Sequence, residues 1–142
     1  MRYLSIDYGI KRSGLAICDS SETIVSPFGV IRDRKKLFEK IVSLVKTENV
    51  DAVVLGLPLN MDDSEGPQAR LVQRFAERLK NHISVPVYLQ DERLSSFAAE
   101  KKLSGIELSK TKRREHIDAI AAAEILEAFL ERKKQGGQNI DA

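Results

Sequence analysis

Carboxylates stand at three places in this sequence where packing would favour apolar side chains. Asp7 ends the first apolar run, the pair Asp91 and Glu92 follows another, and Asp118 opens an alanine-rich segment. A buried carboxylate without a partner is costly, and hard divalent cations bind through oxygen ligands of this kind. If the fold brings the three places together, they predict a metal-dependent centre for phosphodiester cleavage.

Asp118 is the most informative of these residues. At helical spacing it heads an apolar stripe that should pack on a sheet. The stripe consists of Ala121, Ala122, Ile125 and Phe129. The alanines would let the helix approach the sheet closely, which brings Asp118 toward the strand ends that carry Asp7 and Glu92. The alternative is a structural aspartate held by a serine hydroxyl or a backbone amide.

Asp91 and Glu92 follow a strand in which side chains alternate between the two faces, so only one of them is expected to point into a given site. The other could accept hydrogen bonds at the start of the next helix or pair with Arg93. The spacing does not decide between them.

Basic residues lie close in sequence to the candidate acids in two segments. Lys11 and Arg12 follow Asp7 between glycines that would let a phosphate backbone approach. A second group precedes the last helix, where the helix dipole favours anions. It consists of Lys110, Lys112, Arg113 and Arg114. Phosphate binding would explain this placement, and a solvated loop is the alternative.

Composition predicts one domain. The chain has 142 residues, 42% of them hydrophobic, and a formal net charge of +2. Without the four candidate carboxylates the remainder carries six excess positive charges, as suits a polyanionic substrate. The single cysteine, Cys18, is expected to be a small buried residue, and His82 and His116 lie on unrelated segments, so a zinc site is not expected. No signal peptide or membrane span is visible, which predicts a cytoplasmic protein.

Apolar periodicity predicts the order βββαβαβα, in which the last α stands for two successive helices. Strands are expected at 3–6, 14–18, 24–31, 52–57 and 85–89, and helices at 35–46, 69–79, 97–103 and 114–132. Three hairpin-linked strands followed by crossover helices give an α/β architecture, a mixed five-stranded sheet flanked by helices. The domain is expected to span residues 1–132, and residues 133–142, which have nothing to bury, are expected to be a disordered tail.

Five successive motifs resemble those of the YqgF/RuvX family, whose members are described as Holliday junction resolvases and as nucleases that mature the precursor of 16S ribosomal RNA. The motifs are DYGIKRSGLA from Asp7, GLPLNMD from Gly56, SEGP from Ser64, DERLS from Asp91 and DAIAA from Asp118. They cover the chain apart from its tail, in the family's order. Asp63, where glycine is expected, is a departure in a loop.

The resemblance implies an RNase H-like fold and an acidic centre at Asp7, at Asp91 or Glu92, and at Asp118. It implies a nuclease using two Mg²⁺ or Mn²⁺ ions, with the cations and Asn60 contacting nucleic acid. The expected partners are pre-rRNA or branched DNA and ribosomal particles, with no membrane. The oligomeric state is left open between a monomer and a weak homodimer.

Two other functional classes share this pattern. Asp-x-Gly after a first strand also resembles the phosphate loop of actin-like and sugar-kinase ATPases, but those need two such domains and this chain supplies one. A catalytically silent nucleic-acid-binding module is the second alternative. Retention of all three acids argues against it, since binding alone would improve without negative charge near the phosphates.

Overall fold

The computed structural model describes residues 1–60, 62, 64–92, 110–136 and 140–141 of the chain, and in 110–116 and 140–141 it describes the backbone alone. The helix expected at 97–103 lies outside these residues, as does Arg93. The strands are β1 (Tyr3–Asp7), β2 (Ser13–Cys18), β3 (Val25–Ile31), β4 (Ala52–Leu57), β5 (Val87–Asp91) and β6 (Ile140–Asp141). The helices are α1 (Arg34–Thr47), α2 (Pro67–Lys80) and α4 (Lys110–Lys134).

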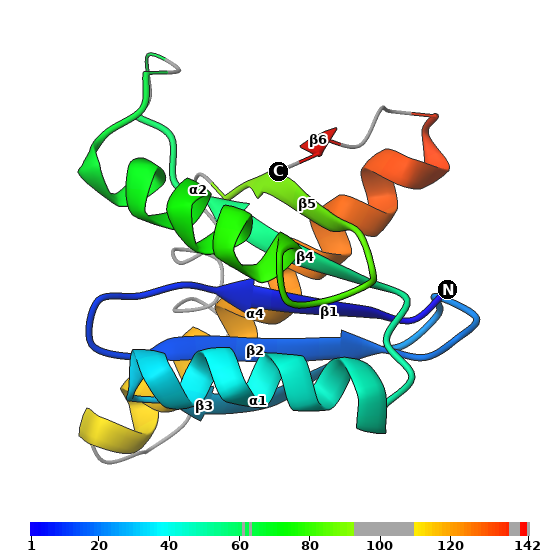
Figure 1. Ribbon diagram of the computed structural model, residues 1–142, viewed down its shortest axis with the longest axis horizontal. Helices are drawn as coiled ribbons and strands as arrows, with labels where there is room; N and C mark the ends of the chain where they lie inside the picture. The colour runs from blue at the N-terminus through cyan, green and yellow to red at the C-terminus, as the bar shows by residue number, and fades with distance from the viewer. Residues whose placement is uncertain (61, 63, 93–109, 137–139, 142) are drawn as a thin grey trace.

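The strands form one mixed sheet in the order β3-β2-β1-β4-β5-β6. β1 pairs antiparallel with β2 and parallel with β4, and β4 pairs parallel with β5. α1 and α2 lie on one face of this sheet and α4 on the other (Figure 1). The predicted α/β class is therefore confirmed, and β6 adds a short sixth strand to the five expected.

Side-chain alternation divides the core between the two faces. Leu4 and Ile6 of β1 belong to the cluster that includes the apolar faces of α1 and α2. Tyr3 points the other way and packs edge-on against Phe129 of α4, with ring centroids 5.2 Å apart. Residues 3, 5 and 7 of β1 therefore share the α4 face.

The C-terminal ends of the three parallel strands lie at one edge of the sheet. β1, β4 and β5 run parallel, so their C-terminal ends meet there, and α1, α2 and α4 begin at the same edge (left in Figure 1). Local sequence sets these starts: Asp33 caps α1 by accepting from the backbone N–H groups of Lys35 and Lys36, and Pro67 opens α2. Ligand sites in open α/β sheets form at this carboxyl edge.

The C-terminal segment differs from the expected tail. α4 continues through Lys134, and Lys133 donates to the Tyr3 hydroxyl and to Glu22, both at 2.9 Å. Ile140 and Asp141 then pair antiparallel with β5. The prediction of disorder from Lys133 considered only hydrophobic burial, whereas Lys133 makes polar contacts and Ile140 and Asp141 pair at the edge of β5. Within the described residues, no helix has the length and apolarity required to cross a membrane.

Candidate active site

Two buried carboxyl groups meet on the α4 face of the sheet. Asp7 ends β1, Glu92 follows the last residue of β5, and their side chains are hydrogen-bonded to each other. Burial is the main cause that raises the pKa of Glu92 to about 9 and the pKa of Asp7 to about 6. Two like charges so close and so buried are unfavourable, so the pair holds one proton between its two carboxyl groups.

Strand alternation separates Glu92 from Asp91. Val87 and Leu89 of β5 pack in the core beneath α2, so Asp91, the next residue on that side, faces away from α4. Tyr88 packs with the α4 cluster, and Gln90 accepts a hydrogen bond from Arg132 of α4 at 3.2 Å. Glu92, two residues after Gln90, lies on the same side of the sheet, facing α4. Glu92 therefore lies beside Asp7, and the alternation places Asp91 on the opposite face of β5.

Gly56 of β4 makes room for the Glu92 side chain. A Cβ atom at residue 56 would lie 3.0 Å from Glu92 Cδ and 2.6 Å from Ile125 Cδ1, and closer still to a Glu92 carboxyl oxygen. Real Cβ atoms essentially never come as close as this one would to Ile125 Cδ1, and the contact with Glu92 Cδ would be tighter than most. Only glycine at this position lets the glutamate lie across the strand toward Asp7.

α4 approaches the sheet closely where it carries Asp118. A Cβ atom at Gly14 of β2 would overlap the backbone carbonyl of Asp118, and Gly14 lies directly opposite Asp7 in the ladder. Further along, the buried Ser5 hydroxyl donates to the carbonyl of Ala122 at 2.7 Å, which ties helix to strand. The close approach expected from the alanines is thus observed, with Gly14 and Ser5 as its partners in the sheet.

The Asp118 carboxylate forms an ion pair with the guanidinium of Arg12. The side chains are 18% and 27% exposed, so the pair lies at the mouth of the site and not in the core. Both charges act on Asp7: the Asp118 carboxylate raises its pKa and Arg12 lowers it. Three of the predicted acids and one predicted cation therefore form a single electrostatic cluster.

The turn that presents Arg12 is fixed by its own backbone. The N–H of Gly9 donates to the hydroxyl of the buried Ser13 at 3.1 Å, and a Cβ atom at residue 9 would overlap the carbonyl of Arg12. Lys11, at the tip, is exposed. The predicted phosphate-approach loop is therefore a tight turn with one cation directed to Asp118 and the next facing solvent.

The remaining residues predicted to contact nucleic acid are not part of this cluster, or their side chains are not described. Asn60 is exposed in the loop after β4, where its amide donates to the Ser64 hydroxyl at 3.0 Å. The four basic residues at 110–114 form the first turns of α4, at the same edge of the sheet as Asp7, and only their backbone is described. Arg93 lies outside the described residues.

Sequence reasoning missed one cation at this edge of the sheet, on the face that α1 covers. Arg34, the first residue of α1, lies over the ring of Tyr8 with its guanidinium carbon 5.4 Å from the centroid, and Tyr8 directly follows Asp7. Gly56 and Ser5 were also not identified as residues that shape the site, whereas Gly14, expected to let a phosphate backbone approach, was not expected to accommodate the backbone of Asp118. A glycine inside a strand is a recognised sign of close backbone approach, and that signal was present at positions 14 and 56.

The donor chemistry fits a hard divalent cation. Asp7 and Glu92 hold one proton between two buried carboxyl groups, so ionisation of both near neutral pH requires another positive charge in place of that proton. Across the described part of the chain, no three His, Cys, Asp or Glu side chains are grouped so that they could hold a metal ion. Asp118, the third expected ligand, is engaged by Arg12.

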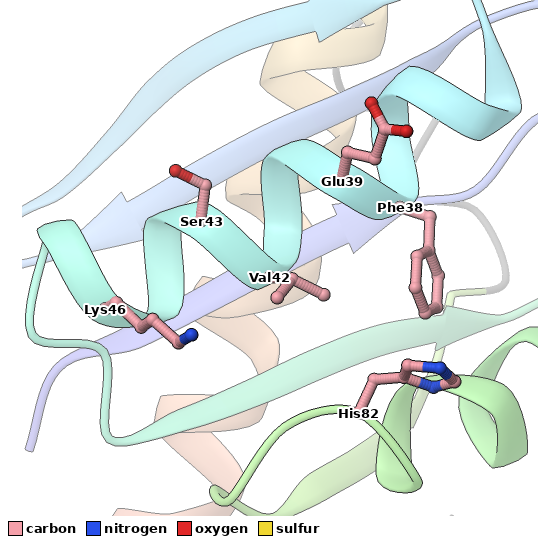
Figure 2. A pocket seen from close by; sticks show the side chains of 6 residues that line it. All are labelled: Phe38, Glu39, Val42, Ser43, Lys46 and His82. Atoms are coloured by element: carbon pink, nitrogen blue, oxygen red, sulfur yellow. The ribbon is translucent and has the colours of Figure 1, made fainter.

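A separate pocket lies away from these carboxylates. It has a volume of about 460 Å³, and Figure 2 shows it between α1 and His82, which follows α2. Its lining consists of Phe38, Glu39, Val42, Ser43, Lys46 and His82. None of the predicted site residues lines it, and it belongs to the helix side opposite α4. The carboxylate cluster, and not this hollow, is the candidate active site.

Curated relatives match nearly the whole chain. A protein of Roseiflexus sp. (strain RS-1) is 37% identical over 135 residues, which cover 94% of this chain and 96% of the relative. Proteins of Maridesulfovibrio salexigens and Bacillus mycoides are each 40% identical, and the matches cover 93% and 94% of this chain and 99% and 100% of those relatives. All three bear the name "Putative pre-16S rRNA nuclease".

Solved structures with little sequence similarity share the fold. The RuvC protein of T. thermophilus in complex with a Holliday junction substrate superposes with a TM-score of 0.64 at 13% identity over 100% of both chains. The Fowlpox virus resolvase in complex with Holliday junction DNA gives 0.56 at 16% identity over 94% of this chain and 99% of the resolvase. These likenesses confirm the RNase H-like fold that the motifs implied.

A family model supplies the last comparison. The model described as "RuvX: Holliday junction resolvase" matches residues 1–132, the span predicted for the folded domain. Together with relatives about 40% identical along nearly their full length, this match shows that the chain belongs to the RuvX family.

Proposed function

We propose that this protein is a metal-dependent endonuclease that cleaves phosphodiester bonds of structured nucleic acid, with the 16S rRNA precursor as its substrate. The observation that supports it best is the Asp7–Glu92 carboxyl pair, buried on the same face of the sheet as Asp118. Two acids forced to share a proton are unfavourable for folding alone, so a fold that keeps them requires another use for the charge.

Asp7, Glu92 and Asp118 would hold two Mg²⁺ or Mn²⁺ ions. Such ions, when bound, activate a water nucleophile and stabilise the leaving oxygen of the phosphodiester. Gly56 leaves room for the Glu92 side chain beside Asp7, and the β1 ladder positions the aspartate. Asp118 is positioned by the contact of its backbone with Gly14.

The cations would hold the substrate. Arg12 can present its planar fork to a phosphate at the mouth of the site, and Lys11 and Arg34 lie at the same edge of the sheet. The basic residues at 110–114, together with Asn60 and Arg93, would contact the flanking strand. This arrangement places positive charge around an acidic centre, as a polyanionic substrate requires.

RNA is proposed as the substrate because the curated relatives, at 37% to 40% identity, are named for the 16S rRNA precursor. Cleavage of Holliday junctions is the second candidate, favoured by the description of the family model. Symmetric cleavage of a junction would need two active sites and therefore a dimer, whereas processing of one RNA end needs a single site. We propose a monomer or weak homodimer that acts in the cytoplasm on ribosomal particles.

The proposal is tested by incubating purified protein with end-labelled precursor RNA and with a synthetic four-way junction, in Mn²⁺ and in EDTA. Cleavage of the RNA in Mn²⁺ alone is expected. Glu92→Gln should abolish it, and Asp91→Asn, which removes a neighbouring charge from the other face of β5, should retain most of it. Cleavage in EDTA, or equal loss in both variants, would contradict the proposed centre.

A further inference from the structure

Arg12 has two roles that compete with each other. Its guanidinium is paired with the Asp118 carboxylate, yet the proposed function gives the guanidinium to a phosphate and the carboxylate to a metal ion. A guanidinium makes its strongest contacts through parallel N–H bonds to a single carboxylate or phosphate. Either ligand must therefore compete with the ion pair that the structure contains.

The position of the pair makes this exchange feasible. Asp118 is 18% exposed and Arg12 27% exposed, so both heads reach solvent and neither would be stranded in the core when the pair opens. Arg12 projects from the tight turn before Ser13, whose buried hydroxyl holds Gly9, so the turn is fixed while the side chain can exchange partners. The Asp118 backbone is fixed by Gly14.

Opening the pair is unfavourable for either ligand alone. A metal ion that takes Asp118 leaves Arg12 beside a new cation, and a phosphate that takes Arg12 leaves Asp118 beside Asp7, whose pKa it already raises. If both ligands bind, the displaced groups are both satisfied. Each ligand therefore lowers the free-energy cost of binding the other, and such coupling is reciprocal.

We propose that the Arg12–Asp118 ion pair is a latch that keeps the third carboxylate from the metal until a nucleic-acid phosphate takes Arg12. This inference rests on the proposed function and specifies how its site is regulated. Metal and substrate then bind cooperatively, with each raising the affinity for the other by a factor of about 5 to 150. Arg12 is a positioning residue for Asp118 as well as a phosphate contact.

Arg12→Gln separates the latch from simple charge repulsion. Without the guanidinium, Asp118 loses this ion pair, so calorimetric titration with Mn²⁺ alone should show affinity about tenfold higher than wild type. Lys11→Gln is the matched control, because it removes an adjacent positive charge that is exposed and is not the partner of Asp118. Its effect on Mn²⁺ affinity should be much smaller.

The second measurement is the same titration with a saturating RNA hairpin present, its integrity checked by gel electrophoresis afterwards. RNA should raise the Mn²⁺ affinity of wild type and of Lys11→Gln strongly, and that of Arg12→Gln much less. Arg12→Lys keeps the positive charge but lacks the planar guanidinium, so its gain in Mn²⁺ affinity on adding RNA should lie between those of wild type and Arg12→Gln. This variant also controls for a folding defect in Arg12→Gln, and circular dichroism measures the folding of both.

The outcomes distinguish the latch from the nuclease assignment. If Arg12→Gln binds Mn²⁺ no more tightly than Lys11→Gln, or if RNA raises its affinity as much as that of wild type, the latch is wrong while the metal site stands. If wild type binds no Mn²⁺ even with RNA present, both the metal-dependent function and the latch are wrong.

Discussion

Gly14 of β2 lies against the backbone of Asp118, so closely that a Cβ atom at position 14 would overlap the Asp118 carbonyl. This contact determines how near the helix that carries the third acid comes to the strand that carries the first, because Gly14 is also the ladder partner of Asp7. One missing methyl group thus sets the spacing between two elements of the candidate site.

Gly14→Ala should therefore push α4 away from the sheet. We expect a loss of stability of about 1 to 3 kcal/mol, as for other overpacked positions, together with a loss of cleavage in the folded fraction. Gly29→Ala is the control, because a Cβ atom at residue 29 would have no neighbour within 4 Å. Chemical denaturation and a cleavage assay measure both effects, and equal behaviour of the two variants would contradict the role of Gly14.

Asp118→Asn removes charge while keeping volume and hydrogen-bonding capacity. The ion pair with Arg12 that it removes is partly exposed, and repulsion toward Asp7 is relieved at the same time, so the two effects on stability oppose each other. Metal-free stability should change little while cleavage collapses. Destabilisation by about 1 to 3 kcal/mol with retained cleavage would instead identify Asp118 as a structural residue.

The shared proton predicts how metal-free stability depends on pH. The pKa of Glu92 is raised to about 9 and that of Asp7 to about 6, so the folded protein holds protons that the unfolded chain has released. This contribution to stability is complete below the ordinary pKa values of the two side chains, 3.8 for Asp7 and 4.5 for Glu92, and is lost as pH rises toward 9. Unfolding free energy in EDTA should fall across that interval.

Glu92→Gln tests the source of this slope. The amide is neutral at every pH and can still donate a hydrogen bond to Asp7, so the variant should lose most of the pH dependence and be more stable than wild type at a pH of about 8. Mn²⁺ replaces the proton, and its affinity for the wild type should rise with pH. If Glu92→Gln kept the wild-type pH dependence of stability, the titrating group would be a residue other than Glu92.

The basic residues at the start of α4 are expected to bind substrate. Lys112→Ala with Arg113→Ala should weaken RNA binding and reduce the slope of log affinity against log salt by about 0.7 to 0.9 for each phosphate that is no longer neutralised. Cleavage at saturating RNA should persist. Lys46→Ala with Lys80→Ala removes two exposed charges near the other ends of α1 and α2 and should leave the slope unchanged. If both pairs behave alike, the cluster is only a solvated surface.

The sequence by itself determined the order of the elements and the acids that could form a centre. Apolar periodicity is a local property, so β4 was predicted with its observed bounds and α1 to within one residue at each end. It did not reveal β6 or the continuation of α4 to Lys134, because these depend on pairing at the edge of β5 and on contacts of Lys133 with Tyr3 and Glu22.

Only the tertiary structure decided which acids meet. Alternation along β5 showed that Asp91 and Glu92 face opposite ways, but which face α4 covers depends on how the chain crosses the sheet. The same holds for Arg12, whose partner Asp118 lies 106 residues away. Composition and spacing specify what a side chain can do, whereas its pKa and its partner depend on burial and on neighbours that are distant in sequence.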